Sequence, residues 1–157
     1  MPSVVRLSEA RTIPATVERA CDAVLETPLP EVFRHRYGVF PAITEVRDHD
    51  GEWGRAGLTR TVVLSSGATM RETLTHVARP YFVEFTLADL EGRMAAVVAS
   101  VEGHWLFEPV GTGVQISLAW NVHPASRRAL LAMPLFQLFW HGYARSAFDE
   151  IESILLA

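Results

Sequence analysis

The 157-residue chain is 49% apolar and 20% charged, a composition that excludes an intrinsically disordered protein. Its length is that of one ordinary domain, so we expect a single domain over residues 1–157 with a core that needs no disulfides. Fourteen basic residues against eighteen acidic ones give a formal charge of −4, so we expect no nucleic-acid partner.

Because the sequence shows no targeting signal, we expect a cytoplasmic protein. Residues 1–13 carry charges and no apolar block, so we expect no export signal. The most apolar stretch, Ala129–Trp140, is too short for a bilayer span and is interrupted by Pro134, so no integral membrane segment is expected. Cys21 is the only cysteine and can form no intrachain disulfide, which is consistent with a reducing compartment.

The first part of the chain predicts a strand followed by two short elements. In Val17–Glu26, apolar and charged residues roughly alternate, which favours a strand with one wet face. A short helix is expected from Pro30 to about His35. Tyr37–Ile43 contains a glycine and a proline and is either a turn or a second short helix. The first fifteen residues fit no element and form a candidate N-terminal extension.

The middle of the chain predicts a run of antiparallel strands. The clearest signal is a hairpin that turns at Ser66-Gly67. A turn is also expected at His49-Asp50-Gly51 and another at Gly111-Thr112-Gly113. The predicted strands are Thr44–Asp48, Leu58–Ser65, Ala68–Val77, Tyr81–Leu87, Met94–Glu108 and Val114–His123.

After His123 the apolar period changes from two to 3.6 residues. Pro134–Leu155 is therefore predicted as one long helix, with an apolar stripe from Phe136 to Ile154. Such a helix after a meander must cover one face of the sheet. The expected fold is α+β: a curved antiparallel sheet around a long C-terminal helix, with two short helices after the first strand and a gap that can hold a ligand.

Several motifs in this order resemble the START-like (SRPBCC) superfamily, which includes the polyketide cyclase/dehydrase and lipid-transport group and Bet v 1-like proteins. The resemblance covers Thr16–Leu156. It rests on Thr27-Pro28-Leu29-Pro30-Glu31-Val32-Phe33, Trp53, Gly57, Arg60, Gly67, Glu72, Trp105-Leu106-Phe107-Glu108-Pro109, Gly111-Thr112-Gly113-Val114 and the C-terminal helix. It implies the helix-grip fold and an internal apolar cavity, and it leaves the chemistry open.

The central hairpin carries the best candidate site. Arg60 is expected opposite Glu72 or one step away, and His76 falls on the same face as Glu72. Charged side chains on an apolar face are rarely buried unless they are paired. The pair can fix the hairpin register or contact a ligand, and both alternatives stay open. His76 is either a ligand contact or general base, or a half-buried structural histidine.

Aromatic residues predict a wall for the cavity. We expect Trp105, Trp120 and Tyr143 to contact a ligand, although such residues more often simply form core. Trp53 is interpreted as a loop anchor near the mouth. No metal-binding motif and no nucleotide fingerprint occurs, so neither a metal nor a cofactor is expected.

Three functions fit these observations. The first is binding, and possible transport, of a hydrophobic small molecule or lipid. The second is a polyketide cyclase/dehydratase-like enzyme, for which Arg60, Glu72 and His76 are the only acid–base candidates that fall together. The third is a self-associating domain whose interior is filled by its own aromatic residues, with a homodimer as one form. The residues do not decide whether the chain is an enzyme.

Overall fold

The computed structural model describes residues 3–49 and 52–157, which form one antiparallel sheet and several helices. The strand order across the sheet is β1-β7-β6-β5-β4-β3-β2. The strands are β1 (Val5–Ile13), β2 (Ile43–Arg47), β3 (Thr59–Leu64), β4 (Thr69–Ala78), β5 (Phe82–Ala88), β6 (Val98–Val110) and β7 (Gly113–Pro124). The helices are α1 (Val17–Glu26), α2 (Leu29–Val32), α3 (Gly92–Val97), the 3₁₀ turn η1 (Arg128–Leu131) and α4 (Met133–Leu156).

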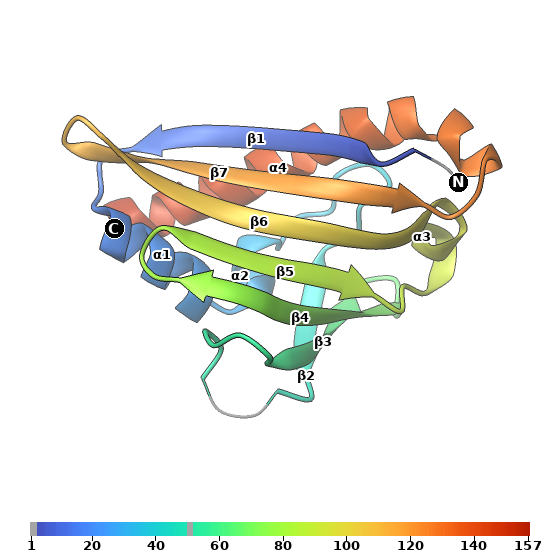
Figure 1. Cartoon of the computed structure of the whole chain (residues 1–157), viewed down its shortest axis with the longest axis horizontal. Coiled ribbons are helices and arrows are strands. Elements are labelled where there is room, and N and C mark those ends of the chain that lie inside the picture. The colour runs from blue at the N-terminus through green and yellow to red at the C-terminus, as the bar shows by residue number, and fades with distance from the viewer. Residues whose placement is uncertain (1–2, 50–51) are drawn as a thin grey trace.

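The long helix α4 lies across one face of the sheet, as Figure 1 shows. Its buried stripe runs from Phe136 through Trp140 to Ile151 and joins the main core, whereas Ile154 is 36% exposed. Pro134 stands in the first turn, where its missing N–H interrupts no helical hydrogen bond. The predicted helix-grip architecture is confirmed: a curved antiparallel sheet holds one C-terminal helix, and two short helices follow the first strand.

The first strand lies earlier in the chain than predicted. Val5–Ile13 forms β1, which pairs with β7 along its whole length. The strand was hidden because two of its inward positions, Glu9 and Arg11, are charged. Glu9 accepts a 2.8 Å hydrogen bond from His141 Nδ1, and Arg11 lies 2.6 Å from Asp149, so α4 supplies a partner for each charge.

Val17–Glu26, predicted as a strand, is the helix α1. The Thr16 side chain accepts a hydrogen bond from the Arg19 amide at 3.1 Å and caps the N-terminus. Glu18 lies in the first turn, where a negative charge is favourable. The buried residues Cys21 and Leu25 are four apart, so they fit a helical face, and tertiary packing of that face decides the structure.

One further prediction changes in detail, and one open alternative is decided. Met94–Glu108 was predicted as one strand, but its beginning belongs to α3, and β6 starts only at Val98. A run rich in valine and alanine does not separate buried helix from buried strand by its period. Tyr37–Ile43 contains a tight turn, closed by hydrogen bonds between Tyr37 and Phe40, rather than a helix. The predicted turn at His49-Asp50-Gly51 includes residues 50–51, which lie outside the described residues.

Candidate ligand-binding site

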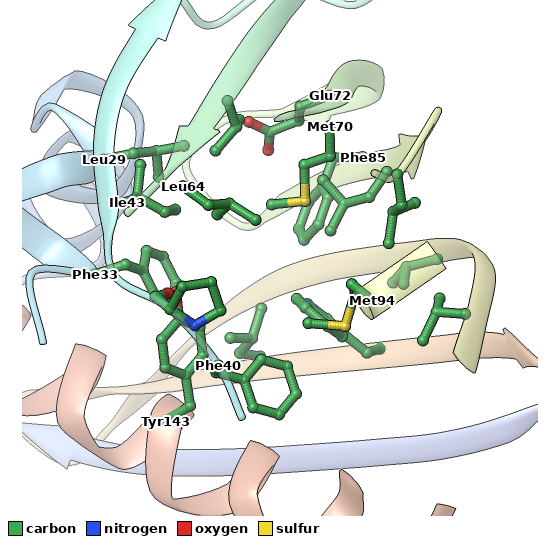
Figure 2. A pocket seen from close by; sticks show the side chains of 18 of the residues that line it. Leu29, Phe33, Phe40, Ile43, Leu64, Met70, Glu72, Phe85, Met94 and Tyr143 are labelled. Carbon is green, nitrogen blue, oxygen red and sulfur yellow. The ribbon is translucent and has the colours of Figure 1, made fainter. Parts of the chain in front are cut away.

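An apolar pocket lies between the concave face of the sheet and α4 (Figure 2). Its walls come from α2, the turn before β2, strands β2–β7, α3 and α4. The aromatic part of the wall includes Phe33, Phe40, Phe85, Trp105, Trp120 and Tyr143. The volume of the pocket is about 70 Å³.

The ion pair predicted from the hairpin is present on the inner face. Arg60 of β3 and Glu72 of β4 are directly opposed in the register. Arg60 Nε donates a hydrogen bond to Glu72 Oε1 at 2.7 Å. The two residues are only 8% and 7% exposed. Burial raises the pKa of the Glu72 carboxyl above its ordinary value, and the Arg60 guanidinium opposes this shift.

The ion pair stands between two cavities. Glu72 lines both the main pocket and a smaller cavity of about 20 Å³, and Phe85 and Trp105 also line both. Arg60 lines only the smaller cavity, where its guanidinium carbon lies 3.8 Å from the centre of the Trp53 ring. Trp53 therefore covers the cation instead of simply anchoring a loop, a contact that the sequence could not predict because the two residues lie in separate segments.

His76 does not share the inner face with Glu72. The pairing of β4 with β5 shifts between Leu74 and His76, and such an irregularity exchanges the faces on which later side chains lie. His76 is exposed, and its ring packs 5.7 Å from that of Phe82, which in turn lies 5.4 Å from His104. The predicted grouping of His76 with Arg60 and Glu72 is therefore wrong.

The three predicted aromatic residues all line the main pocket. The Tyr143 hydroxyl donates a 3.0 Å hydrogen bond to the carbonyl oxygen of Pro41, which ties α4 to the chain entering β2. Its ring stacks on Phe40 with 5.0 Å between centroids. Burial raises the pKa of Tyr143, so the hydroxyl stays protonated and remains a donor. The ring of Trp105 meets Phe148 edge-on at 6.1 Å.

Other lining residues were missed in the sequence. Met70 and Met94 lie on the pocket wall, and Figure 2 shows them with their sulfur atoms inside the site. Met70 precedes Glu72 by two positions and so falls on the same strand face, a signal that was available. Met94 was predicted in a strand, so its place on the pocket wall could not be predicted, because that place depends on helix α3. Methionine side chains are flexible and adapt a pocket to its contents.

The described residues show neither a metal-binding cluster nor a membrane-spanning helix. Over residues 3–49 and 52–157, no three His, Cys, Asp or Glu side chains come together in a way that would hold a metal ion. In the same residues, no helix combines the length and apolar character needed to cross a bilayer.

The architecture is the helix-grip fold of Bet v 1-like proteins. The structure of truncated norcoclaurine synthase from Thalictrum flavum is similar, with a TM-score of 0.73 at 14% identity, over 99% of this chain and 97% of that one. Major latex-like protein 151 from Panax ginseng gives 0.70 at 14% identity, over 99% and 100%. Ara h 8.0201 gives 0.69 at 14% identity, over 98% and 99%. At this identity the likeness establishes the fold alone.

The sequence itself places the chain more narrowly. Residues 4–154 match the family described as polyketide cyclase / dehydrase and lipid transport, and the chain belongs to this family. No curated protein matches the sequence. The resemblance inferred from the motifs is confirmed.

Proposed function

We propose that this protein binds a hydrophobic small molecule in the pocket between the sheet and α4. The observation that carries the proposal is the pocket itself: an apolar, aromatic-lined space in the protein interior with one charged side chain, Glu72, on its wall. Apolar surface removed from water supplies affinity, and a single polar group orients the ligand. Trp105, Trp120 and Tyr143 are the proposed aromatic contacts, and Arg60 is proposed to act through Glu72.

Two findings support this proposal beyond the pocket. The family description includes lipid transport. A norcoclaurine synthase with this fold forms a complex with dopamine and hydroxybenzaldehyde, so the architecture accommodates one-ring molecules in at least that protein. His76, which is exposed on the outer face, is not part of the proposed site.

The test is direct binding. Native mass spectrometry and calorimetric titration against a panel of fatty acids, polycyclic compounds and alkylbenzenes should give saturable, one-to-one binding for at least one apolar class. A matched variant, Leu118→Trp, fills the pocket from β7 and should abolish that binding in a folded protein, because Leu118 lines the wall. Absence of binding across the panel, or binding that survives Leu118→Trp, would contradict the proposal.

The alternative function is cyclisation or dehydration of a bound substrate. It is favoured by the buried Glu72 carboxyl, whose pKa is raised and which lies on the wall of the main pocket. With His76 outside, Glu72 is the acid–base group available to such a reaction from the predicted trio. Loss of turnover in Glu72→Gln with unchanged ligand affinity would favour an enzyme, whereas absence of turnover with every bound compound would favour a carrier.

A further inference from the structure

One charged side chain on the wall of the main pocket has acceptor capacity left. Glu72 is its charged wall residue, and the Tyr143 hydroxyl already donates to Pro41. Among residues 3–49 and 52–157, Glu72 accepts one hydrogen bond, the one from Arg60 Nε to Oε1. A carboxylate has about four lone-pair sites, so Glu72, which lines both cavities, has acceptor capacity left. Figure 2 shows Glu72 on the pocket wall beside Met70.

The cation of the pair is turned away from this pocket. The Arg60 guanidinium lies under the Trp53 ring and lines only the smaller cavity. A ligand in the main pocket therefore meets the anionic side of the pair. A ligand carboxylate or phosphate would place a second negative charge beside Glu72 in an apolar space, which is unfavourable.

The charge balance also disfavours a cationic ligand. Arg60 and Glu72 together carry no net charge, so a protonated amine would leave one uncompensated positive charge in the interior. A neutral hydroxyl group supplies a hydrogen to the free acceptor positions and adds no charge. The charges around the pocket therefore favour a ligand with a neutral hydrogen-bond donor.

The small size of the pocket favours a compact ligand. The space of about 70 Å³ is smaller than the roughly 150 Å³ of an engineered cavity that holds benzene. Entry of a ring therefore requires side chains to move, and Met70 and Met94 are flexible enough to do so without breaking the sheet. A ligand with a single ring requires smaller side-chain movements than a long-chain or polycyclic ligand.

We infer that the main pocket takes a compact, uncharged, apolar molecule with one hydroxyl group, such as a one-ring phenol or alcohol, whose hydroxyl donates a hydrogen bond to Glu72. This inference rests on the proposed function and names the chemical class of its ligand.

The test is a matched series measured by calorimetry on the wild-type protein near neutral pH. The series is 4-propylphenol, 4-propyltoluene (a methyl group in place of the hydroxyl), 4-propylbenzoate and 4-propylbenzylammonium. The phenol should bind about tenfold or more tightly than the toluene, because its hydroxyl makes a charge-assisted hydrogen bond. The benzoate and the ammonium compound should both bind more weakly than the phenol.

A double variant tests whether Glu72 causes the preference for the phenol over the toluene. The double substitution Arg60→Met with Glu72→Leu removes both charges, so no buried ion is left unpaired. In this variant the toluene should bind at least as tightly as the phenol. Circular dichroism and urea denaturation check its folding, and should it fail to fold, the wild-type series decides alone.

Each result has a defined meaning. Tightest binding of the benzoate or the ammonium compound, or equal binding of phenol and toluene, overturns the inference and leaves the proposed function standing. A phenol preference that survives in the double variant overturns the role of Glu72. If no member of this series or of the wider apolar panel binds, the inference and the proposed function fall together.

Discussion

Arg60 and Glu72 face each other across β3 and β4 and are joined by a 2.7 Å hydrogen bond from Nε to Oε1, although both residues are more than nine-tenths buried. Two opposite charges held this way are each stabilised mainly by the other, because water does not reach them freely. The consequences of removing one charge and of removing both should therefore differ.

The first prediction follows from that pair. Glu72→Gln should lower the free energy of unfolding by about 3–5 kcal/mol, since it leaves the Arg60 cation buried without a counter-charge. Arg60→Met with Glu72→Leu should cost much less, within about 1.5 kcal/mol of wild type, because apolar side chains of similar volume replace the pair. Urea denaturation measures both. A double variant less stable than Glu72→Gln would contradict this account.

The second prediction concerns the link between α4 and the chain entering β2. Tyr143→Phe removes the donor to the Pro41 carbonyl and should cost about 1–2 kcal/mol, since a part-buried acceptor loses its hydrogen-bond partner. Tyr81→Phe is the control, because Tyr81 is 52% exposed and should change stability by less than about 0.5 kcal/mol. Chemical denaturation of both variants makes the comparison, and equal effects would show that the hydrogen bond contributes nothing.

The third prediction concerns a close approach on the pocket wall. Gly103 of β6 pairs with Phe85 of β5, and a β-carbon at Gly103 would lie 2.3 Å from the Phe85 ring. Gly103→Ala must displace this buried ring, which lines both cavities. It should cost about 1–3 kcal/mol and weaken ligand binding.

Gly142→Ala is the matched control for Gly103→Ala. A β-carbon there would lie even closer to a ring, 2.0 Å from Tyr37, but Tyr37 is 42% exposed and can turn into solvent. Alanine also stabilises a helix interior by up to about 1 kcal/mol relative to glycine. Gly142→Ala should therefore be neutral or stabilising. Thermal unfolding and ligand titration would contradict the prediction if both variants lost the same stability and affinity.

The fourth prediction concerns Cys21, which is 1% exposed on α1. Burial raises the pKa of its thiol to about 11, so at pH 8 roughly one thiol in a thousand is ionised. Because the thiolate is the nucleophile, labelling by a disulfide reagent should be very slow in the native protein. The rate should rise as the pH approaches the thiol pKa, and labelling in guanidinium chloride should be fast and complete. Fast native labelling at pH 8 would show that α1 opens readily.

Local patterns in the sequence determined much of the fold. The period change after His123 predicted α4, because a helix must present one apolar stripe to the sheet. The Ser66-Gly67 turn predicted the β3–β4 hairpin and placed Arg60 opposite Glu72 or one step away from it. A short turn leaves two alternating strands little freedom in pairing, so the hairpin follows from neighbouring residues alone. Residues 65–68 lie between the two strands, and the observed register decides that Arg60 and Glu72 are directly opposed rather than one step apart.

Only the tertiary structure decided the rest. Glu9 and Arg11 made β1 look polar, and their partners His141 and Asp149 stand more than 130 positions away on α4. The irregularity after Leu74 turned His76 outward, and no residue type marks its position in advance. The contact of Trp53 with Arg60, which turns the anionic side of the pair toward the main pocket, also joins separate segments. These features depend on packing between distant parts of the chain. A local sequence pattern carries no information about the energies of such contacts.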